Sequence, residues 1–215
     1  GRFGDRNVRA YQVRAELSLH CDNSDVVGLA CLRRAQSGGL TRLASATTVF
    51  NLMLRECPQH LPPLFAGLYY SRKGEQGPGE PAVSPRRIPV FSECEGALSC
   101  RYLRSWAEYA RIHDGVTMTP EETAALDAFD AIAQREGVAL DMMLEPGDAQ
   151  FASNYTVLHG RTAYEDDPAA PRHMLRLWLE LPGFRPLAGN DVRYGHIRHG
   201  QLGRTAAEIS APTGA

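Results

Sequence analysis

Three side chains of this sequence belong to the types that bind a divalent metal ion. His20 and Asp22 lie two positions apart at the end of the run AELSLHCDN, and His159 ends a later run, NYTVLH. Side chains two positions apart on a strand point to the same face of a sheet, so His20 and Asp22 would face one ion together. An ordinary surface pair is the other explanation for His20 and Asp22, because the pattern H-x-D often arises by chance.

The later histidine favours a metal site, provided that two strands far apart in the sequence meet. Two imidazoles and one carboxylate leave three coordination positions open, which is the ligand set of non-haem Fe(II) oxygenases. A zinc hydrolase could use the same three ligands with a metal-bound water. A non-catalytic binding module would need none of them. The ligands alone leave these three classes of protein open.

Two arginines follow His159 and bear on the choice between these classes. Arg172 begins the strand-like run RHMLRLWL, and Arg176 comes four positions later, on the same expected face. A buried guanidinium beside an iron site suits a dicarboxylic keto acid, because it would hold the distal carboxylate through charge-assisted, often bidentate hydrogen bonds. A zinc hydrolase has no need of such an arginine, and the sequence offers no obvious general base for one.

The elements that position these side chains are expected to be mainly strands. Alternating or continuous apolar runs predict strands at AELSLH, DVVGLACLRR, ALDMMLE, AQFASNYTVLH and HMLRLWLEL. Pro146 and Gly147 predict a type II turn between the third and fourth of these runs. Many short strands with tight turns and few helices favour a mostly β protein, either a sandwich or a jelly roll with helices packed outside.

Helices are predicted at three places outside the strands. Their ranges are 45–55, 101–112 and 120–136. Thr119 would cap the last of these helices, with Pro120 at its first position and Glu122 completing a capping box. In the second helix, Arg101 and Arg104 would face either the substrate or water.

Composition and charge are those of an ordinary globular protein. The 215 residues are 43% hydrophobic and 22% charged, with a formal net charge of -2, and no basic block would attract nucleic acid or an anionic membrane. The five cysteines include no C-x-x-C, which favours a reducing compartment over a disulfide framework. No apolar run is long enough to cross a bilayer, so we expect a cytoplasmic protein. The sequence sets no oligomeric state.

A resemblance to one family rests on three stretches: LSLHCDNSDVVGLACLRRAQSGGLTRLAS, EPGDAQFASNYTVLHGRTAYEDD and RHMLRLWL. In order and spacing they are similar to the Fe(II)/2-oxoglutarate-dependent dioxygenases of the taurine dioxygenase (TauD/TfdA) family, and the similarity extends from about Tyr11 to Leu187. The resemblance implies a double-stranded β-helix, or jelly roll, with flanking α-helices in a domain over residues 1–188. It leaves residues 189–215 as a polar tail or lid.

The resemblance also implies a role for each candidate residue. Three of them would ligate the iron: His20, Asp22 and His159. Arg172 would pair with the distal carboxylate of 2-oxoglutarate, and Thr41 would supply a hydroxyl group to the same carboxylate. Arg176 would lie near the co-substrate or the substrate.

The implied activity is hydroxylation or desaturation of a small molecule by O2, as 2-oxoglutarate is converted to succinate and CO2. The primary substrate would be a small acid, an amino-acid derivative or an intermediate of secondary metabolism. Family members that halogenate lack the carboxylate ligand, so Asp22 favours oxygenation. Only nineteen residues precede His20, fewer than in other members, so either this chain is part of a longer protein or its pocket is unusually open.

Overall fold

The computed structural model describes residues 14–72, 76, 78–113 and 115–188. Most elements in these ranges are strands, accompanied by helices, which agrees with the mostly β prediction. The tail or lid expected over residues 189–215 lies outside the described residues. None of the helices in the described ranges is long and apolar enough to cross a membrane.

One sheet has four antiparallel strands in the order β1-β9-β4-β7. Their bounds are Leu17–His20 for β1, Val157–Arg161 for β9, Thr41–Ser45 for β4 and Ala139–Met142 for β7. Strand β9 pairs with both β1 and β4, so segments from distant parts of the sequence lie side by side on it. A metal site built from His20 and His159 requires this meeting of distant strands.

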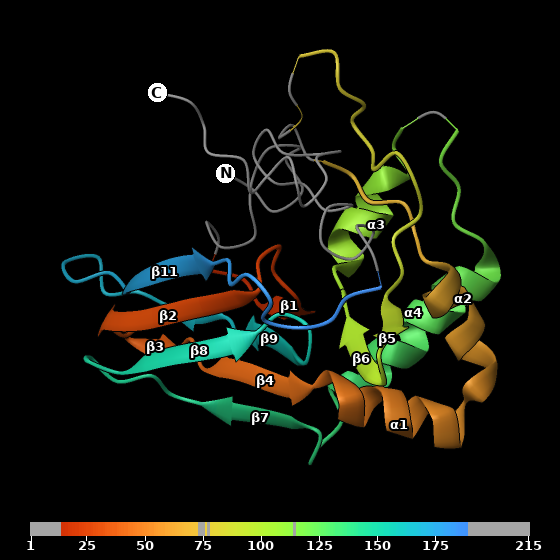
Figure 1. Ribbon diagram of the computed structural model, residues 1–215. Coiled ribbons are helices and arrows are strands. Elements are labelled where there is room, and N and C mark those ends of the chain that lie inside the picture. The colour runs from red at the N-terminus through yellow and green to blue at the C-terminus, as the bar shows by residue number, and fades with distance from the viewer. Residues whose placement is uncertain (1–13, 73–75, 77, 114, 189–215) are drawn as a thin grey trace.

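A second sheet has three antiparallel strands in the order β11-β2-β8, and it lies beside the first (Figure 1). Their bounds are His173–Leu179 for β11, Val26–Arg33 for β2 and Ala149–Ser153 for β8. The prediction of one strand over AQFASNYTVLH is wrong, because β8 and β9 belong to different sheets. Asn154 and Tyr155 occupy the break between them, and their side chains bond to the loop that follows β1.

Two short ladders complete the strands. Strand β3 pairs with β10, and β5 pairs with β6. Their bounds are Ser37–Gly38 for β3, Tyr164–Glu165 for β10, Phe91–Cys94 for β5 and Ala97–Cys100 for β6. Gly38 has a φ of 65°, and a Cβ there would lie 2.2 Å from the carbonyl oxygen of Ala163. The turn that leads into β4 therefore requires glycine.

The helices of the described ranges gather beside the sheets, on the right of Figure 1. Their bounds are Ala46–Glu56 for α1, Pro58–His60 for the 3-10 helix η2, Leu61–Ala66 for α2, Arg104–Ala110 for α3 and Pro120–Ala133 for α4. The prediction for α1 is confirmed to within one residue. Helix α3 is shorter than predicted and begins after Arg101, whose backbone N–H donates to the carbonyl oxygen of Val90 instead.

The start of α4 follows the predicted capping box. Thr119 Oγ1 accepts a hydrogen bond from the backbone N–H of Glu122, and the Glu122 carboxylate accepts one from the backbone N–H of Thr119. Such a cap stabilises a helix by about 1 kcal/mol. The helix ends at Ala133, three residues earlier than predicted, because the chain then turns with a hydrogen bond from the N–H of Val138 to the carbonyl oxygen of Arg135.

The four-stranded sheet has one face against the helices and the other toward the second sheet. Ala44 and Leu158 pair across β4 and β9, and both lie in the hydrophobic core with Val49 of α1 and Leu126 of α4. Because side chains alternate along a strand, the next position, His159, points away from this core. The helices therefore support the sheet from behind, and the opposite face is left for a site.

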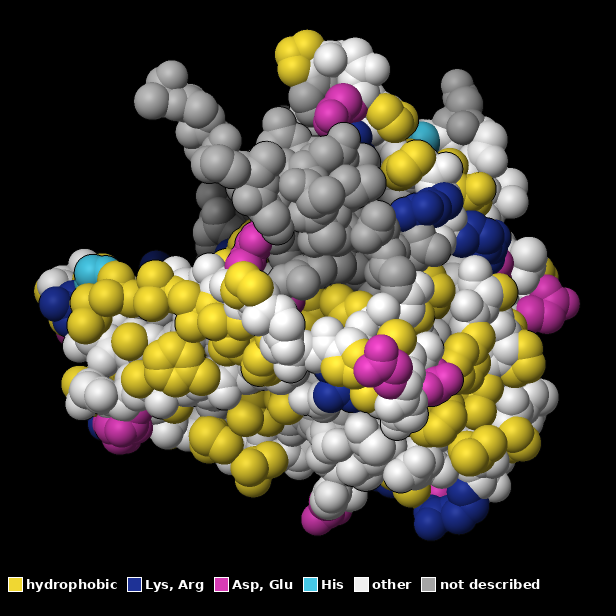
Figure 2. All heavy atoms as spheres, viewed as in Figure 1, with side chains coloured by type: hydrophobic (Ala, Val, Ile, Leu, Met, Phe, Trp, Pro, Cys, Tyr) yellow, Lys and Arg dark blue, Asp and Glu magenta, His cyan; other side chains and the backbone are white. Residues whose placement is uncertain are grey.

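The second sheet has an apolar outer face. Phe151 and Leu177 both pair with Gly28, and 63% and 57% of their surfaces are exposed. Figure 2 shows hydrophobic side chains gathered over β11, β2 and β8, at the left of the view. Alternation along β11 then turns Arg176 and Trp178 to the inner face, toward the first sheet.

Candidate metal centre

His20 and His159 lie directly opposite each other on β1 and β9. Their ring centroids are 4.3 Å apart at an interplanar angle of 49°. Both side chains are buried, with 8% and 5% of the residue surfaces exposed. Opposed positions of an antiparallel pair face the same side of the sheet, so the strand register alone brings the two imidazoles together.

Gly160, next to His159, lets β1 come close to β9. A Cβ at this position would lie 2.6 Å from the carbonyl oxygen of Leu17 and 3.2 Å from the backbone nitrogen of Leu19. A contact of that length with backbone atoms forces one strand to move. The imidazole pair therefore depends on a glycine at position 160.

Asp22 lies two residues beyond the end of β1, so the pleat of the strand does not place it, contrary to the sequence prediction. Its main chain is held from both sides instead. Asn154 Oδ1 accepts a hydrogen bond from the Asp22 N–H at 2.9 Å, and Arg101 Nη1 donates to the Asp22 carbonyl oxygen at 2.5 Å. Arg101 is thus neither on a helix nor facing water, and only 2% of it is exposed.

The loop that follows Asp22 is held by the same region. Arg101 Nη2 donates to Asn23 Oδ1 at 2.7 Å, and the Tyr155 hydroxyl donates to Asp25 Oδ1 at 2.6 Å. The guanidinium of Arg101 also lies over the Tyr155 ring, 5.6 Å from its centroid. Hydrogen bonds to charged groups contribute about 1.5–3 kcal/mol each, so this loop has one strongly preferred conformation.

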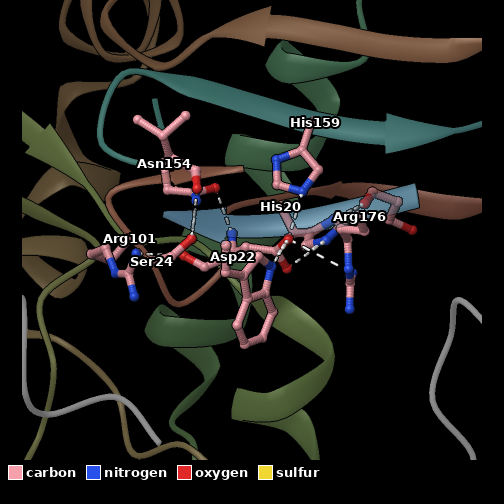
Figure 3. Close-up of polar contacts among 10 residues, drawn as sticks. His20, Asp22, Ser24, Arg101, Asn154, His159 and Arg176 are labelled. Atoms are coloured by element: carbon pink, nitrogen blue, oxygen red, sulfur yellow. Dashed lines mark hydrogen bonds and ion pairs between the residues drawn. The ribbon is translucent and has the colours of Figure 1, made fainter. Parts of the chain in front are cut away.

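The Asp22 carboxylate reaches both imidazoles, as Figure 3 shows. Its Oδ1 lies 3.7 Å from His20 Nε2, and its Oδ2 lies 3.4 Å from His159 Nε2. One ligand atom from each of the three residues lies within 4.8 Å of the others. Metal–ligand bonds of about 2.1 Å place neighbouring ligand atoms about 3 Å apart, so small shifts would close these three groups around one ion.

The two histidines differ at their second ring nitrogen. His20 Nδ1 lies 2.8 Å from the carbonyl oxygen of Ser18. A carbonyl oxygen only accepts, so Nδ1 carries the proton and Nε2 presents its lone pair to the site, as metal ligation requires. His159 Nδ1 is buried and has no hydrogen-bond partner among the described residues.

Burial and mutual contacts set the charges of the three groups. Burial opposes ionisation of Asp22, but its contacts with His159 and His20 outweigh burial and hold the pKa of Asp22 well below its usual range. Burial lowers the pKa of His159, and the neighbouring His20 lowers it further. Burial also opposes a charge on His20, but contact with Asp22 gives a net rise in the pKa of His20.

This donor set fits a first-row divalent cation. It offers two imidazole nitrogens and one carboxylate oxygen, with Asp22 anionic and the lone pair of His20 Nε2 directed to the site. Two histidines and one carboxylate on one side of an ion leave three positions for other ligands. Iron(II) is the metal that this arrangement characteristically holds.

Strand β11 adds two side chains, of which the sequence analysis found Arg176 and missed Trp178. Trp178 Nε1 donates to Asp22 Oδ2 at 2.8 Å, and Arg176 Nη1 lies 3.7 Å from the same oxygen. The Arg176 guanidinium stacks over the indole, 5.1 Å from its centroid. A spacing of two between Trp178 and Arg176 was the available signal, because it puts both side chains on one face of a strand.

Arg172 lies just before β11, beside a second arginine. Its guanidinium is 5.4 Å from the centroid of the Tyr164 ring, and that of Arg161 is 4.5 Å from the same centroid. Burial lowers the pKa of both arginines, and the charge of Arg172 lowers that of Arg161 further. Among the described residues no carboxylate forms an ion pair with the Arg172 guanidinium.

Thr41 faces the same side of the sheet as His159. It pairs with Arg161 across β4 and β9, and only 4% of it is exposed. Thr41 Oγ1 donates to Gln150 Oε1 on β8 at 3.2 Å, so the two sheets touch here. Gln150 Nε2 is buried and has no hydrogen-bond partner among the described residues. The sequence analysis did not single out Gln150, although its alternation with Phe151 marks it as inward-facing.

The structure therefore places the predicted site residues in two groups along one polar interior. The first group surrounds the candidate metal position: His20, Asp22, His159 and Arg176. The second comprises Thr41 and Arg172, both close to Arg161. These positions agree with the roles that the resemblance implies, and the roles themselves stay predictions.

Solved structures of iron oxygenases share this fold. An asparagine oxygenase in complex with Fe(II), 2S,3S-3-hydroxyasparagine and succinate matches with a TM-score of 0.60 at 20% identity, over 78% of this chain and 50% of that one. The non-haem iron oxygenase OrfP in complex with Fe and alpha-ketoglutaric acid matches with a TM-score of 0.55 at 14% identity, over 78% and 50% of the two chains. The fold of this chain is thus one that non-haem iron oxygenases also have.

The sequence comparison names the family. Residues 3–178 match the family described as "Taurine catabolism dioxygenase TauD, TfdA family". The chain therefore belongs to the TauD/TfdA family, and the resemblance seen in its motifs is confirmed. The FR-33289 synthase of Streptomyces rubellomurinus is 37% identical over 202 residues, which is 91% of this chain and 59% of that protein. This chain thus spans about half to three-fifths of the length of these relatives.

Proposed function

We propose that this protein is an Fe(II)- and 2-oxoglutarate-dependent oxygenase that hydroxylates or desaturates a small molecule. One observation carries the proposal: the triad of His20, Asp22 and His159 lies close to the cation of Arg172. Arg161, two positions beyond His159 on β9, lies over the same tyrosine ring as Arg172. A zinc hydrolase would use the triad and has no need of Arg172. A non-catalytic binding module would need neither feature.

Three residues would hold the iron: His20, Asp22 and His159. Iron bound there supplies the redox chemistry that couples reduction of O2 to oxidation of a C–H bond. The protein keeps the Asp22 carboxylate anionic and fixes its backbone through Asn154 and Arg101, so its geometry is set before any ligand arrives. The Ser18 carbonyl oxygen holds the proton of His20 on Nδ1, away from the ion.

Arg172 would bind the distal carboxylate of 2-oxoglutarate, because a guanidinium matches a carboxylate in a bidentate pair. The nearby charge of Arg161 adds to the attraction for a dianion. The Gln150 amide N–H, which has no partner among the described residues, would donate a hydrogen bond to the co-substrate. The Thr41 hydroxyl would turn its single hydrogen from Gln150 Oε1 to the same carboxylate. Arg176, next to Asp22, would face the end of the co-substrate nearest the iron.

The primary substrate is proposed to be an amino acid, an amino-acid derivative or an intermediate of secondary metabolism. The asparagine oxygenase was solved with a hydroxylated asparagine, and OrfP was solved with (3S)-hydroxy-L-Arg. The synthase of Streptomyces rubellomurinus supports the secondary-metabolism part of the proposal by its name alone. Succinate and CO2 would be the products formed from 2-oxoglutarate.

The two sheets and their short ladders are proposed to form a double-stranded β-helix in a single oxygenase domain over residues 1–188, with a tail or lid after it. Five free thiols among the described residues fit a reducing compartment, in line with the expectation of a cytoplasmic enzyme. Small molecules and O2, rather than nucleic acid or a membrane, are the proposed partners.

The proposal is tested by anaerobic reconstitution of the chain with Fe(II) and 2-oxoglutarate. Chelation of the metal by the keto acid should give a weak visible charge-transfer band. The band should be absent in His159→Ala and should require far more 2-oxoglutarate in Arg172→Ala. Arg55→Ala removes an exposed arginine on α1 and should leave the band unchanged.

Two results would contradict the proposal. A chain that binds metal but gives no band at saturating 2-oxoglutarate does not use this co-substrate, and a zinc hydrolase would become the better explanation. A chain that binds neither Fe(II) nor Zn(II) would be the non-catalytic binding module.

A further inference from the structure

We propose that Trp178 is a positioning residue that holds Asp22 in a one-oxygen mode of metal ligation and so keeps a coordination position open for 2-oxoglutarate. This inference rests on the proposed function. It concerns a residue that carries no metal ligand atom, and it predicts separate effects on the metal and on the co-substrate.

The indole of Trp178 is directed at the metal ligand by the register of the second sheet. Trp178 pairs with Val27, and Val27 pairs with Ala152 on its other side, so all three share the inner face. From that face Trp178 Nε1 donates to Asp22 Oδ2 at 2.8 Å. An indole N–H donates and never accepts, so the contact has a single polarity and favours the anionic carboxylate.

The hydrogen bond distinguishes the two carboxylate oxygens of Asp22. Each oxygen faces one imidazole, Oδ1 that of His20 at 3.7 Å and Oδ2 that of His159 at 3.4 Å. Only Oδ2 also accepts the indole N–H and lies 3.7 Å from Arg176 Nη1. A carboxylate binds a metal ion through either one or both oxygens. Because the indole fixes the rotation of the carboxylate and occupies a lone pair of Oδ2, it favours ligation through Oδ1 alone.

One-oxygen ligation matters because of the number of positions around the ion. A six-coordinate ion with three single-atom protein ligands keeps three positions open. A carboxylate that binds through both oxygens takes one of these positions. A chelating keto acid needs two adjacent positions, and O2 needs a further one, so the second mode would compete with the co-substrate.

Arg176 gives the indole a second contact, which must be separated from the hydrogen bond. Its guanidinium lies 5.1 Å from the centroid of the Trp178 ring, so the ring also supports Arg176. Two substitutions divide these functions. Trp178→Phe keeps an aromatic face and removes the N–H donor, whereas Trp178→Gln keeps an N–H donor three bonds from Cβ and removes the ring.

Both variants should fold, because 38% of Trp178 is exposed and its replacement leaves the core intact. Trp106→Phe is the matched control. Trp106 is the other tryptophan of the chain, and it packs against the core from α3. Thermal unfolding of all three variants checks that the fold is kept.

The experiment measures two dissociation constants under anaerobic conditions. Titration with Co(II), followed by its visible absorption, gives the metal affinity and reports the coordination number. Titration of the Fe(II)-loaded chain with 2-oxoglutarate, followed by the charge-transfer band, gives the co-substrate affinity. In Trp178→Phe we expect Co(II) to bind at least as tightly as in the wild type, with an altered visible spectrum, because the second oxygen of Asp22 displaces a solvent ligand. We expect 2-oxoglutarate to bind about tenfold more weakly, at the lower end of what loss of an outer partner costs.

The variants separate this inference from the proposed function. Restored 2-oxoglutarate affinity in Trp178→Gln, together with a wild-type result for Trp106→Phe, would support the role of the N–H donor. Unchanged 2-oxoglutarate affinity in Trp178→Phe would overturn it, and a loss confined to Trp178→Gln would assign the effect to packing of the ring against Arg176. Equal losses in both variants would overturn the assignment to the N–H donor alone. Failure of the wild-type chain to give the band would instead count against the proposed function.

Discussion

The two ends of the polar interior are built in different ways. At the metal end, the backbone of Asp22 is held on one side by Asn154 and on the other by Arg101. At the opposite end, the guanidinium groups of Arg172 and Arg161 lie over one tyrosine ring. Within the described part of the chain, no carboxylate forms an ion pair with Arg172.

This difference indicates that folding alone completes one part of the site and leaves the other part for a ligand to complete. Contacts within the protein fix the ligand loop, whereas Arg172 has no carboxylate ion-pair partner among the described residues and is left for a ligand to neutralise. Two neighbouring like charges disfavour each other, and a dicarboxylate bound at Arg172 reduces that repulsion. Metal affinity and co-substrate affinity should therefore respond to different substitutions.

The largest effect is expected from His159→Ala at the metal end. Removal of a ligand should weaken metal binding by more than about 100-fold, since loss of an outer partner alone typically costs 10–100-fold. Anaerobic calorimetry with Fe(II) measures it, and His60→Ala, which alters a histidine of η2, should bind as the wild type does. Undiminished affinity in His159→Ala would place the metal elsewhere.

Arg172→Ala should weaken binding of the co-substrate without affecting the metal end of the site. Loss of hydrogen bonds to a charged group costs about 1.5–3 kcal/mol, so the dissociation constant of 2-oxoglutarate should rise about 10- to 150-fold. The Fe(II) affinity should stay the same, and Arg172→Lys should recover part of the loss, since a lysine keeps the charge without the fork. A parallel fall in both affinities would show that the two ends are not independent.

Asn154→Ala should lower the metal affinity and the stability of the protein, by less than the substitution of a ligand does. It leaves the buried N–H of Asp22 without its partner, which should lower the free energy of unfolding by about 1–3 kcal/mol. Metal affinity should fall about tenfold, as for loss of an outer partner. Urea unfolding and metal titration measure the two effects, and Asn51→Ala, on the exposed side of α1, is the control. A lower free energy of unfolding with unchanged metal affinity would mean that Asn154 supports the fold only.

The smallest effect on either end is expected from Thr119→Ala, which removes the cap of α4. The free energy of unfolding should fall by about 1 kcal/mol. Both dissociation constants should stay within about twofold of the wild type, because distant sites act nearly independently. A larger change in binding would show that loss of global stability also disturbs the site, and the comparison would need stabilised variants.

The residues with intrinsic metal chemistry were accessible from the sequence. His20, Asp22 and His159 carry their ligand atoms whatever surrounds them, and the alternation of apolar residues around His159 predicted its strand. The capping box of α4 was equally local, because Thr119 and Glu122 are three residues apart. In each case a few adjacent positions are sufficient to make the prediction.

The pairing of Arg101 and Asn154 with the backbone of Asp22 was not accessible in this way. Arg101 falls in a run that predicts a helix, and only its backbone bond to Val90 removes it from α3. The apolar alternation of AQFASNYTVLH continues through Asn154, so no local pattern marks the change of sheet. Both contacts join segments far apart in the sequence, and tertiary pairing rather than periodicity decides them.

Gly160 has a consequence for how this sequence is able to diverge. It takes no part in the proposed chemistry, yet a library of random variants should tolerate change there as poorly as at the histidine beside it. Even the methyl group of alanine would meet the carbonyl oxygen of Leu17 at 2.6 Å. Residues that line a pocket are free to drift toward new substrates, but the codon at position 160 is constrained by the spacing of two strands.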